Sequence, residues 1–307
     1  MSDIVISEFM DEAAVAMLRR DFSVIYDEAL VDSPQRLTEL LADCRALIVR
    51  NRTRVGENLL AGAGGVKVVG RLGVGLDNID LDYCRLKGIK VFPATGANNI
   101  AVAEYVMAGL LLLFRGCFWD SASVAAGNWP RQRQIGGELY GKSLGLVGFG
   151  GIARAVAERA RVFGLRILAH DPLIPAQDPC WQICGVERLE LDDLLARSEA
   201  VSLHLPFTKD TRSLFDAERI ARLRPGAFFI NSARGGIVDE AALAAALREK
   251  RLGGALIDVY AQEPLKAGTA LADAPNCILT AHIAGVTRES NVRVSALIAE
   301  KVRAALL

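Results

Sequence analysis

The stretch Ser143-Leu-Gly-Leu-Val-Gly148-Phe-Gly150-Gly151-Ile152-Ala153-Arg154 decides the fold of this chain. An apolar run ends at Gly148, and a helical pattern begins after the glycines. The spacing Gly148-x-Gly150-x-x-Ala153 at a strand-to-helix turn predicts a dinucleotide-binding motif. Gly148 would allow the tight turn, Gly150 the close approach of a pyrophosphate, and Ala153 the close packing of helix on sheet. The free N–H groups and the positive dipole end of the helix would bind the pyrophosphate.

An acid after the next apolar run supports this prediction. Asp171 follows Gly148 at close to the spacing, about 20 residues, at which a carboxylate binds the adenosine ribose hydroxyls. The alternative is a solvated loop acid before Pro172. Because the carboxylate would repel a 2′-phosphate and residues 171–175 contain no Arg, the sequence favours NAD over NADP.

Short runs rich in Val and Ile alternate with helical patterns on both sides of this motif, which predicts parallel sheets covered by helices. The first series ends at a long helix, about 101–115, and the second follows an irregular stretch at 127–141. A length of 307 residues fits two such α/β units. Other expected helices are 11–20, 34–43 and 288–307. The expected strands are Ile4–Ile6, Val24–Tyr26, Ala46–Val49, Val66–Val69, Ile89–Phe92, Leu144–Val147, Arg166–Ala169, Ala200–Leu203, Ala227–Ile230, Ala255–Asp258 and Cys277–Leu279.

The composition is typical of a folded protein, and it has no excess of positive or negative charge. Hydrophobic residues make up 51% of the chain, and 36 Lys+Arg balance 36 Asp+Glu. This balance gives no reason to expect nucleic acid or an anionic membrane as a partner, so small molecules are favoured. The N-terminal stretch lacks the basic residues of a signal peptide, and the apolar run Tyr105–Phe114 is shorter than the roughly 20 residues of a membrane helix. We expect a cytoplasmic protein with a buried helix at 105–114.

The six cysteines are dispersed, which is unlike the dense pattern of a disulfide framework, so reduced thiols are expected. Cys180 and Cys184 form a C-x3-C pair, but no second pair or His follows at the spacing of a zinc finger. We assign no metal to this sequence.

Three polar stretches each follow an apolar strand pattern. They are Asn231–Asp239 with Arg234, Asp258–Pro264 with Glu263, and Thr280–Gly285 with His282. Ligands of open α/β sheets bind at the carboxyl ends of the strands, so Arg, Glu and His are expected to converge. Arg matches a carboxylate, His exchanges a proton near neutral pH, and an adjacent carboxylate favours the imidazolium. The trio suits a redox reaction at a carbon next to a carboxylate.

Taken singly, each of these residues could also have a purely structural role. Arg234 fits a surface turn, Glu263 fits a helix-capping acid before Pro264, and His282 fits a hydrogen-bonded histidine at a strand end. The functional interpretation depends on the three stretches occurring together.

With these motifs in place, the chain resembles the D-isomer-specific 2-hydroxyacid dehydrogenase family, whose members include phosphoglycerate, glycerate, formate and D-lactate dehydrogenases. The similarity spans nearly the whole chain, and the ordered Arg, Glu and His stretches are its most specific part. Ala153 departs from the usual third glycine of the family, a change that small-residue packing tolerates. The matching stretches are Gly70–Asp80, Asn98–Glu104, Gly148–Ala153, Asp171, Ser232–Asp239, Asp258–Pro264 and His282–Gly285.

The resemblance implies two doubly wound parallel-sheet domains of the α/β class. A Rossmann NAD-binding domain, 99–284, would be inserted in a flavodoxin-like substrate domain formed by 1–98 and 285–307. The two crossings near Asn98 and Gly285 would act as a hinge. The family likeness also implies a homodimer, built largely by the NAD-binding domain and an arm at 119–141.

The resemblance further implies an NAD-dependent oxidoreductase that interconverts a small D-2-hydroxy acid and its 2-keto acid. His282 would be the general acid in reduction and the base in oxidation, with Glu263 orienting it and favouring its protonated form. Arg234 would bind the carboxylate and polarise the reacting carbonyl. The alternative from another class is a noncatalytic NAD(H)-sensing protein of the corepressor type, because such corepressors keep the same three residues.

Other matched positions would line the cofactor and substrate sites, mostly through backbone atoms. Gly151 and Ile152 would contact the pyrophosphate, Asp171 the ribose, and Asp258 the nicotinamide carboxamide. The remaining cofactor positions would be Val74, Gly148, Gly150, Leu205, Ser232, Ala233 and Gly285. The substrate positions would be Arg50, Val74, Gly75, Asn98 and Arg234.

Three cations follow the expected strand Ala46–Val49, in the stretch Arg50-Asn51-Arg52-Thr53-Arg54. In family members that act on phosphorylated acids, which this stretch resembles, an Arg at the position of Arg50 reaches the distal phosphate. Because Arg234 is assigned to the carboxylate, Arg50 would bind a second anionic group, as in 3-phosphoglycerate or sulfolactate. The alternative is a solvated basic turn.

Overall fold

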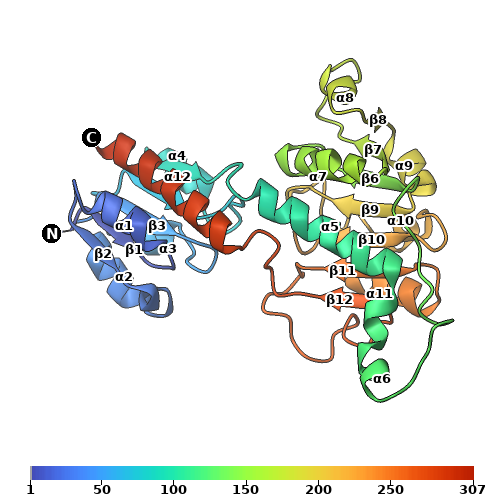
Figure 1. Cartoon of the computed structure of the whole chain (residues 1–307). Helices are drawn as coiled ribbons and strands as arrows, with labels where there is room; N and C mark the ends of the chain where they lie inside the picture. Colours follow the sequence, from blue (N-terminus) through green and yellow to red (C-terminus); the bar gives the residue numbers. More distant parts are fainter. Residues whose placement is uncertain (1) are drawn as a thin grey trace. The chain divides into compact units, whose positions relative to one another are not determined.

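The computed structural model describes residues 2–307, and the chain divides into two compact units (Figure 1). The terminal unit comprises the chain up to Asn98 together with Val286–Leu307, and the central unit is Asn99–Gly285. Each unit contains one sheet, and all the strands of both sheets pair in parallel.

The terminal unit contains five strands in the order β2-β1-β3-β4-β5. This is the flavodoxin-like order, in which the chain leaves β1 for one side of the sheet and returns to β3 on the other. Its elements are β1 (Ile4–Ile6), α1 (Glu12–Leu18), β2 (Val24–Tyr26), η1 (Glu28–Asp32), α2 (Pro34–Leu41), β3 (Ala46–Val49), α3 (Glu57–Leu60), β4 (Val68–Arg71), α4 (Leu81–Leu86), β5 (Lys90–Pro93) and α12 (Arg288–Leu306).

Alternate residues of each strand in this sheet pack on opposite faces, as the two-residue repeat of a strand requires. Ile4 and Ile6 join one core with residues of α1 and α12, whereas Val5 joins a second core with residues of α2 and α3. Figure 1 shows α1 and α12 together over the same face. The sheet is therefore buried on both sides, which explains its short and almost wholly apolar strands.

Local capping signals begin the helices that cover this sheet. Asp11 accepts a hydrogen bond from the Ala13 N–H at the start of α1. Thr287 and Ser290 form a reciprocal capping box at the start of α12. Such caps satisfy N–H groups that have no partner within the helix, so they define where each helix begins.

The central unit contains seven strands in the order β12-β11-β10-β9-β6-β7-β8. Counted within the unit this is the Rossmann order 3-2-1-4-5-6 with a seventh strand added, so the predicted fold class is confirmed. Its elements are α5 (Asn99–Arg115), η2 (Cys117–Asp120), α6 (Ser121–Ala125), β6 (Ser143–Val147), α7 (Gly151–Val162), β7 (Arg166–His170), α8 (Cys180–Ile183), β8 (Glu187–Arg188), α9 (Leu191–Arg197), β9 (Ala200–Leu203), α10 (Ala217–Ala221), β10 (Phe228–Asn231), α11 (Glu240–Arg248), β11 (Gly254–Ile257) and β12 (Cys277–Leu279).

Helices also cover both faces of the central sheet. One core joins α5 and α7 to the strands, and the other joins α9, α10 and α11 to the opposite face. The predicted buried helix at 105–114 is confirmed, because Val106, Leu110 and Leu113 of α5 lie in the first core. Among residues 2–307 no single helix is long and apolar enough to cross a membrane; α5 and the segment Cys117–Ala125 pass that test only as a pair, bent by 69°.

Several element bounds differ from the sequence prediction by a residue or two, and two differences are clearest. The strand expected at Val66–Val69 lies two residues later, at Val68–Arg71, because Val66 packs into the core from the turn before the strand. The short strand β8 was not predicted, since Glu187 and Arg188 are polar and form no apolar run. All six cysteines are free thiols, and the cytoplasmic location stays a prediction.

Candidate active site

Each sheet has a point where its strand order reverses, and ligands of open α/β sheets bind beside the strand carboxyl ends there. In the central unit this point lies between β6 and β9, and in the terminal unit between β1 and β3. The fingerprint turn follows β6, and Arg50 follows β3. The predicted site residues therefore belong to two groups, one in each unit.

The turn after β6 leaves no room for a side chain at Gly148. This residue has a φ of 86°, and a Cβ atom there would lie 2.5 Å from the His204 carbonyl oxygen and 3.1 Å from Leu205. The next helix, α7, has Gly150 as its N-cap, which has no side chain to cap the helix. The first N–H groups of α7, including those of Gly151 and Ile152, are therefore suited to an anionic group.

Asp171 connects the end of β7 to this turn. Its Oδ2 accepts a hydrogen bond from the Phe149 N–H at 2.8 Å, and its Oδ1 accepts from the Leu173 N–H at 2.9 Å. The carboxylate thus lies beside the glycine turn, where the sequence prediction placed the ribose.

Glu263 and His282 form a hydrogen-bonded pair. His282 Nδ1 lies 2.8 Å from Glu263 Oε2, and the Tyr260 N–H donates to Glu263 Oε1 at 3.1 Å. Burial acts to raise the pKa of Glu263, but these two hydrogen bonds and the charges of His282 and Arg234 outweigh it, so the pKa lies below its usual value. The carboxylate therefore stays ionised beside the imidazole. The hydrogen bond between them is made at Nδ1 of His282, so Nε2 takes no part in it.

Asp258 holds the backbone around His282. The His282 residue has a φ of 52°, an uncommon left-handed conformation for a residue with a side chain. Its N–H donates to the Asp258 carbonyl oxygen, and the N–H groups of Ile283 and Ala284 donate to the two Asp258 carboxylate oxygens, all at 2.8 Å. Asp258 is fully buried, so these bonds both satisfy its carboxylate and stabilise the unusual backbone.

Thr280 extends this network into the core. Its hydroxyl donates to Asp258 Oδ1 at 2.6 Å and lies 2.5 Å from the Tyr105 hydroxyl, which is thereby left as the donor of that bond. The Tyr260 hydroxyl donates to the Thr280 carbonyl oxygen at 2.8 Å. Burial raises the pKa of Tyr105, and burial with the nearby Asp258 charge raises the pKa of Tyr260 to about 12. Both phenols are therefore neutral donors that stiffen the loop carrying His282.

The turn carrying Arg234 packs against the loop carrying Glu263. Asn231 at the end of β10 shapes the turn, because its side chain accepts from the Ala233 N–H and donates to the Arg234 carbonyl oxygen, both at 3.1 Å. A Cβ atom at Gly235 would lie 1.7 Å from the Tyr260 carbonyl oxygen. Only glycine permits this approach, which brings the Arg234 turn next to Glu263.

The remaining predicted cofactor positions of the central unit lie along the same sheet edge. Leu205 contacts the fingerprint turn, and Ala233 is buried in the Arg234 turn. Gly285 ends the unit after the His282 loop. Ser232 has a buried hydroxyl oxygen with no hydrogen-bond partner among residues 2–307. A buried polar atom of this kind is suited to a polar ligand group.

The predicted positions of the terminal unit follow its strands β3, β4 and β5. Arg50 follows β3, and its guanidinium donates to Asn291 Oδ1 of α12 at 2.7 Å. Val74 and Gly75 are half-buried in the turn after β4. Asn98 ends the first segment of the unit, and its buried side-chain oxygen has no hydrogen-bond partner among the described residues.

The sequence prediction did not include Gly235, Thr280, Tyr105 or Asn291. Gly235 had a signal, because a Gly-Gly pair directly after Arg234 indicates a close backbone approach. The other three act through hydrogen bonds to residues far away in the sequence, for which no local signal exists. Among residues 2–307 no group of three or more His, Cys, Asp or Glu side chains could hold a metal ion.

Comparison with known proteins decides the family. The model of the D-isomer specific 2-hydroxyacid dehydrogenase family, NAD binding domain, matches residues 107–284. The chain belongs to this family. It is an NAD-dependent 2-hydroxyacid dehydrogenase, an oxidoreductase that acts on a CH–OH donor, which resolves the choice between enzyme and noncatalytic sensor.

Two relatives and one solved structure show the range of this similarity. The chain is 55% identical to (S)-sulfolactate dehydrogenase of Chromohalobacter salexigens, over 100% of the chain and 99% of the relative. It is 36% identical to D-3-phosphoglycerate dehydrogenase of Synechocystis, over 100% of the chain but 54% of that relative, so it spans about half the length of this longer dehydrogenase. The crystal structure of D-lactate dehydrogenase from Aquifex aeolicus complexed with NAD and lactic acid has 28% identity and a TM-score of 0.85, covering 99% of this chain and 95% of that one.

Proposed function

We propose that this 2-hydroxyacid dehydrogenase interconverts a small D-2-hydroxy acid bearing a second anionic group, of the sulfolactate type, and its 2-keto acid. The full-length similarity to (S)-sulfolactate dehydrogenase supports this substrate over phosphoglycerate, for which the matched relatives are longer. The S descriptor is compatible with the D series. The sulfur-bearing carbon outranks the carboxylate in sulfolactate, whereas the carboxylate outranks the methyl group in lactate.

His282 and Glu263 would carry the proton transfer. With Nδ1 committed to the carboxylate of Glu263, the Nε2 of His282 would donate its proton to the carbonyl oxygen in reduction and accept it in oxidation. Arg234 would bind the carboxylate and stabilise the negative charge that develops on the reacting oxygen. NAD bound at the central unit supplies the hydride acceptor for this reaction.

The residues of the central unit fit a dinucleotide. Gly148, Gly150 and Gly151 have no side chains, and the N–H groups of Gly151 and Ile152 open α7, which suits the pyrophosphate. Asp171 would accept from the ribose hydroxyls, and the orphaned hydroxyl of Ser232 would bind a polar group of the cofactor. Asp258 already accepts three hydrogen bonds, which leaves about one acceptor position for the nicotinamide carboxamide. Val74, Leu205, Ala233 and Gly285 would complete the cofactor pocket.

The surroundings of Arg50 support a substrate with a second anionic group. Its side chain is half-buried, and no carboxylate pairs with it among residues 2–307. Arg52, in contrast, pairs with Asp32. A cation that is partly removed from water and lacks a counter-ion gains the most from an anionic ligand. The N–H groups of Val74 and Gly75 and the side chain of Asn98 would bind the rest of the substrate.

The decisive experiment compares three acids with the native enzyme and the Arg50→Ala variant. Formation of NADH is followed by absorbance on sulfolactate, 3-phosphoglycerate and lactate. We expect kcat/KM of the native enzyme to be highest on sulfolactate. The variant should lose about 1.5–3 kcal/mol of transition-state stabilisation on the two acids that have a second anionic group, roughly 10- to 150-fold, with little change on lactate. Equal losses on all three acids would contradict a second-anion contact.

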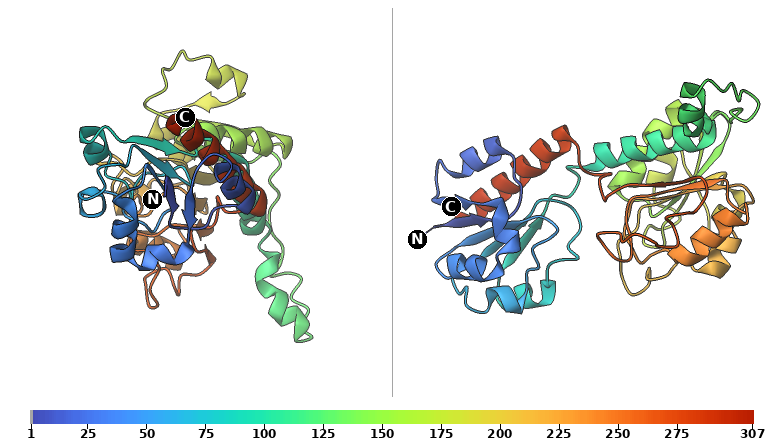
Figure 2. Two further views of the ribbon diagram at one scale, coloured as in Figure 1. Left: turned by 90° about the vertical axis from the view of Figure 1, so that its left-hand side faces the viewer. Right: turned by 90° about the horizontal axis from the view of Figure 1, so that it is seen from below.

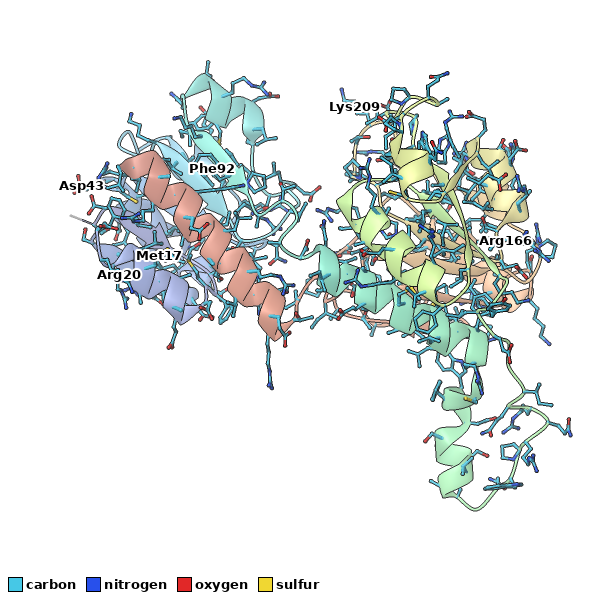
Figure 3. The ribbon with its side chains drawn as sticks, turned by 45° about the horizontal axis from the view of Figure 1, so that its top comes forward. Met17, Arg20, Asp43, Phe92, Arg166 and Lys209 are labelled. Carbon is cyan, nitrogen blue, oxygen red and sulfur yellow. The ribbon has the colours of Figure 1, made fainter. Side chains whose placement is uncertain are left out.

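We also propose a homodimer built largely by the NAD-binding domain and the arm at 119–141. Figures 2 and 3 show the segment around α6 extending from the body of its unit. Its large apolar side chains are exposed: Trp129 is 78% and Ile135 is 73% accessible. Apolar surface of this extent on one segment is typical of a protein–protein interface. Light scattering in solution tests the proposal, and a monomer mass at micromolar concentration would contradict it.

A further inference from the structure

The loop that carries Arg50 is held rigidly at the point where the strand order of the terminal unit reverses. Glu8, which follows β1 and is buried, accepts hydrogen bonds from three N–H groups of this loop. Glu8 Oε1 accepts from Arg50 at 2.9 Å and from Thr53 at 3.0 Å, and Oε2 accepts from Arg52 at 3.1 Å. Asn78 donates to the carbonyl oxygens of Arg50 and Thr53 at 3.2 and 2.7 Å. The backbone at Arg50 is therefore fixed from both sides.

Two further contacts fix the guanidinium itself. It lies over the ring of Phe9, 5.6 Å from the ring centroid, and its Nη2 donates to Asn291 Oδ1 at 2.7 Å. Phe9 follows β1 and Asn291 lies in the first turns of α12, so three distant segments of the chain meet at this group. A guanidinium has five N–H donors in its plane, and Asn291 accepts from one of them. An in-plane edge is therefore suited to an anionic ligand.

Two carboxylates, those of Glu8 and Glu28, act on Arg50 through their charges, and both form hydrogen bonds with other groups. The carboxylate of Glu8 binds the three loop N–H groups, and that of Glu28 accepts from the Tyr26 hydroxyl at 2.6 Å. Burial lowers the pKa of Arg50, in keeping with a guanidinium that has lost water without gaining a carboxylate partner within residues 2–307.

We propose that Asn291 is a specificity-determining residue for the second anionic group of the substrate, because it positions Arg50 through a neutral oxygen and leaves the positive charge available. This inference rests on the proposed function. A carboxylate at position 291 would hold the guanidinium equally well, but it would pair with the charge and repel the substrate anion. The chemical difference between an amide and a carboxylate at one position would then separate dianionic from monoanionic acids.

The test is Asn291→Asp, which keeps the size and the oxygen that accepts from Arg50, replaces the amide NH2 by a second oxygen and adds a negative charge. We expect kcat/KM on sulfolactate to fall about 10-fold or more, mainly through KM, while kcat/KM on lactate changes less than about twofold. Asn58→Asp is the matched control, because Asn58 is an exposed residue of α3 in the same unit that does not hydrogen-bond to Arg50, and it adds the same charge. It should leave both substrates unchanged.

A second variant separates positioning from charge. Asn291→Ala removes the acceptor without adding a charge, and we expect a smaller loss on sulfolactate, about 3- to 10-fold. Native melting temperature and NADH affinity in both Asn291 variants would show that the fold and the cofactor site are intact. If one variant does not fold, the other still decides the question through the ratio of the two substrates.

The outcomes distinguish this inference from the proposed function. If the native enzyme shows no preference for sulfolactate over lactate, the proposed function fails and the inference fails with it. If the native enzyme prefers sulfolactate and Arg50→Ala abolishes that preference, but Asn291→Asp retains it, only the role of Asn291 is refuted. Equal losses on sulfolactate and lactate in Asn291→Asp would likewise refute it, since they would indicate a general structural effect.

Discussion

Gly235 is the position at which one methyl group should have the greatest effect on catalysis. A Cβ atom there would lie 1.7 Å from the carbonyl oxygen and 2.1 Å from the carbonyl carbon of Tyr260. Ordinary contact begins at about 3.4 Å. In Gly235→Ala the turn carrying Arg234 and the loop carrying Glu263 must therefore separate by about 1.5 Å or more. Both contacts are backbone atoms, which cannot move aside as a flexible side chain could.

The expected loss follows from that displacement. A misplacement of about 1 Å in a catalytic group costs about 100-fold in rate, so we expect kcat to fall at least 100-fold in Gly235→Ala. Overpacking should also lower the free energy of unfolding by about 1–3 kcal/mol. The atoms nearest to that Cβ belong to Tyr260 and Ala261 and not to the fingerprint turn after β6, so the pyrophosphate site should stay intact and NADH should still bind. The effect should therefore appear in turnover and in KM for the hydroxy acid.

The assay measures kcat, KM for the hydroxy acid, NADH affinity by fluorescence and the melting curve by circular dichroism. Gly62→Ala is the matched control, since a Cβ atom at Gly62 meets nothing within 4 Å. That variant should have native kinetics and at least native stability. A folded Gly235→Ala enzyme with native kcat and KM would refute the reasoning, because the Arg234 turn would then tolerate separation from the Glu263 loop.

Three further predictions address the proton, the cofactor and stability. His282→Ala should lower turnover by about 100-fold or more while NADH affinity stays nearly native, and unchanged turnover would exclude His282 from proton transfer. Asp171→Ala should erode the preference for NAD over NADP, and Asp171→Asn, which removes the charge but can keep one of the two backbone hydrogen bonds, should erode it as well; a native preference for NADP would contradict the assignment. Burial lowers the pKa of His204 from 6.5 to about 4, so the unfolded state binds more protons between these values and stability falls as pH drops through that window. At pH 5 the free energy of unfolding should be lower by roughly 2 kcal/mol for this reason. Urea unfolding at pH 5 and 7.5 should therefore show a smaller pH dependence for His204→Gln than for the native enzyme.

The candidate site shows how far local sequence signals reach. The glycines after β6, the acid at Asp171 and the Arg, Glu and His stretches were all visible in the sequence, because each motif occupies a few consecutive residues at a strand end. The sequence also indicated that these strand ends share one edge. It could not indicate that Glu263 bonds to His282 at Nδ1, nor that Asp258 supports the His282 backbone, because those contacts depend on how separate loops pack.

The sequence by itself determined the class of fold, the dinucleotide motif and the family, since hydrophobic periodicity, glycine spacing and short motifs are local properties of the chain. Only the tertiary structure decided the order of the strands, the short strand β8 and the surroundings of Arg50. The cation at position 50 was apparent from the sequence, but its contacts with Glu8, Phe9 and Asn291 were not, and Asn291 is 241 residues away. Contacts of that range arise when the sheet and its helices pack into one core, so no local pattern encodes them.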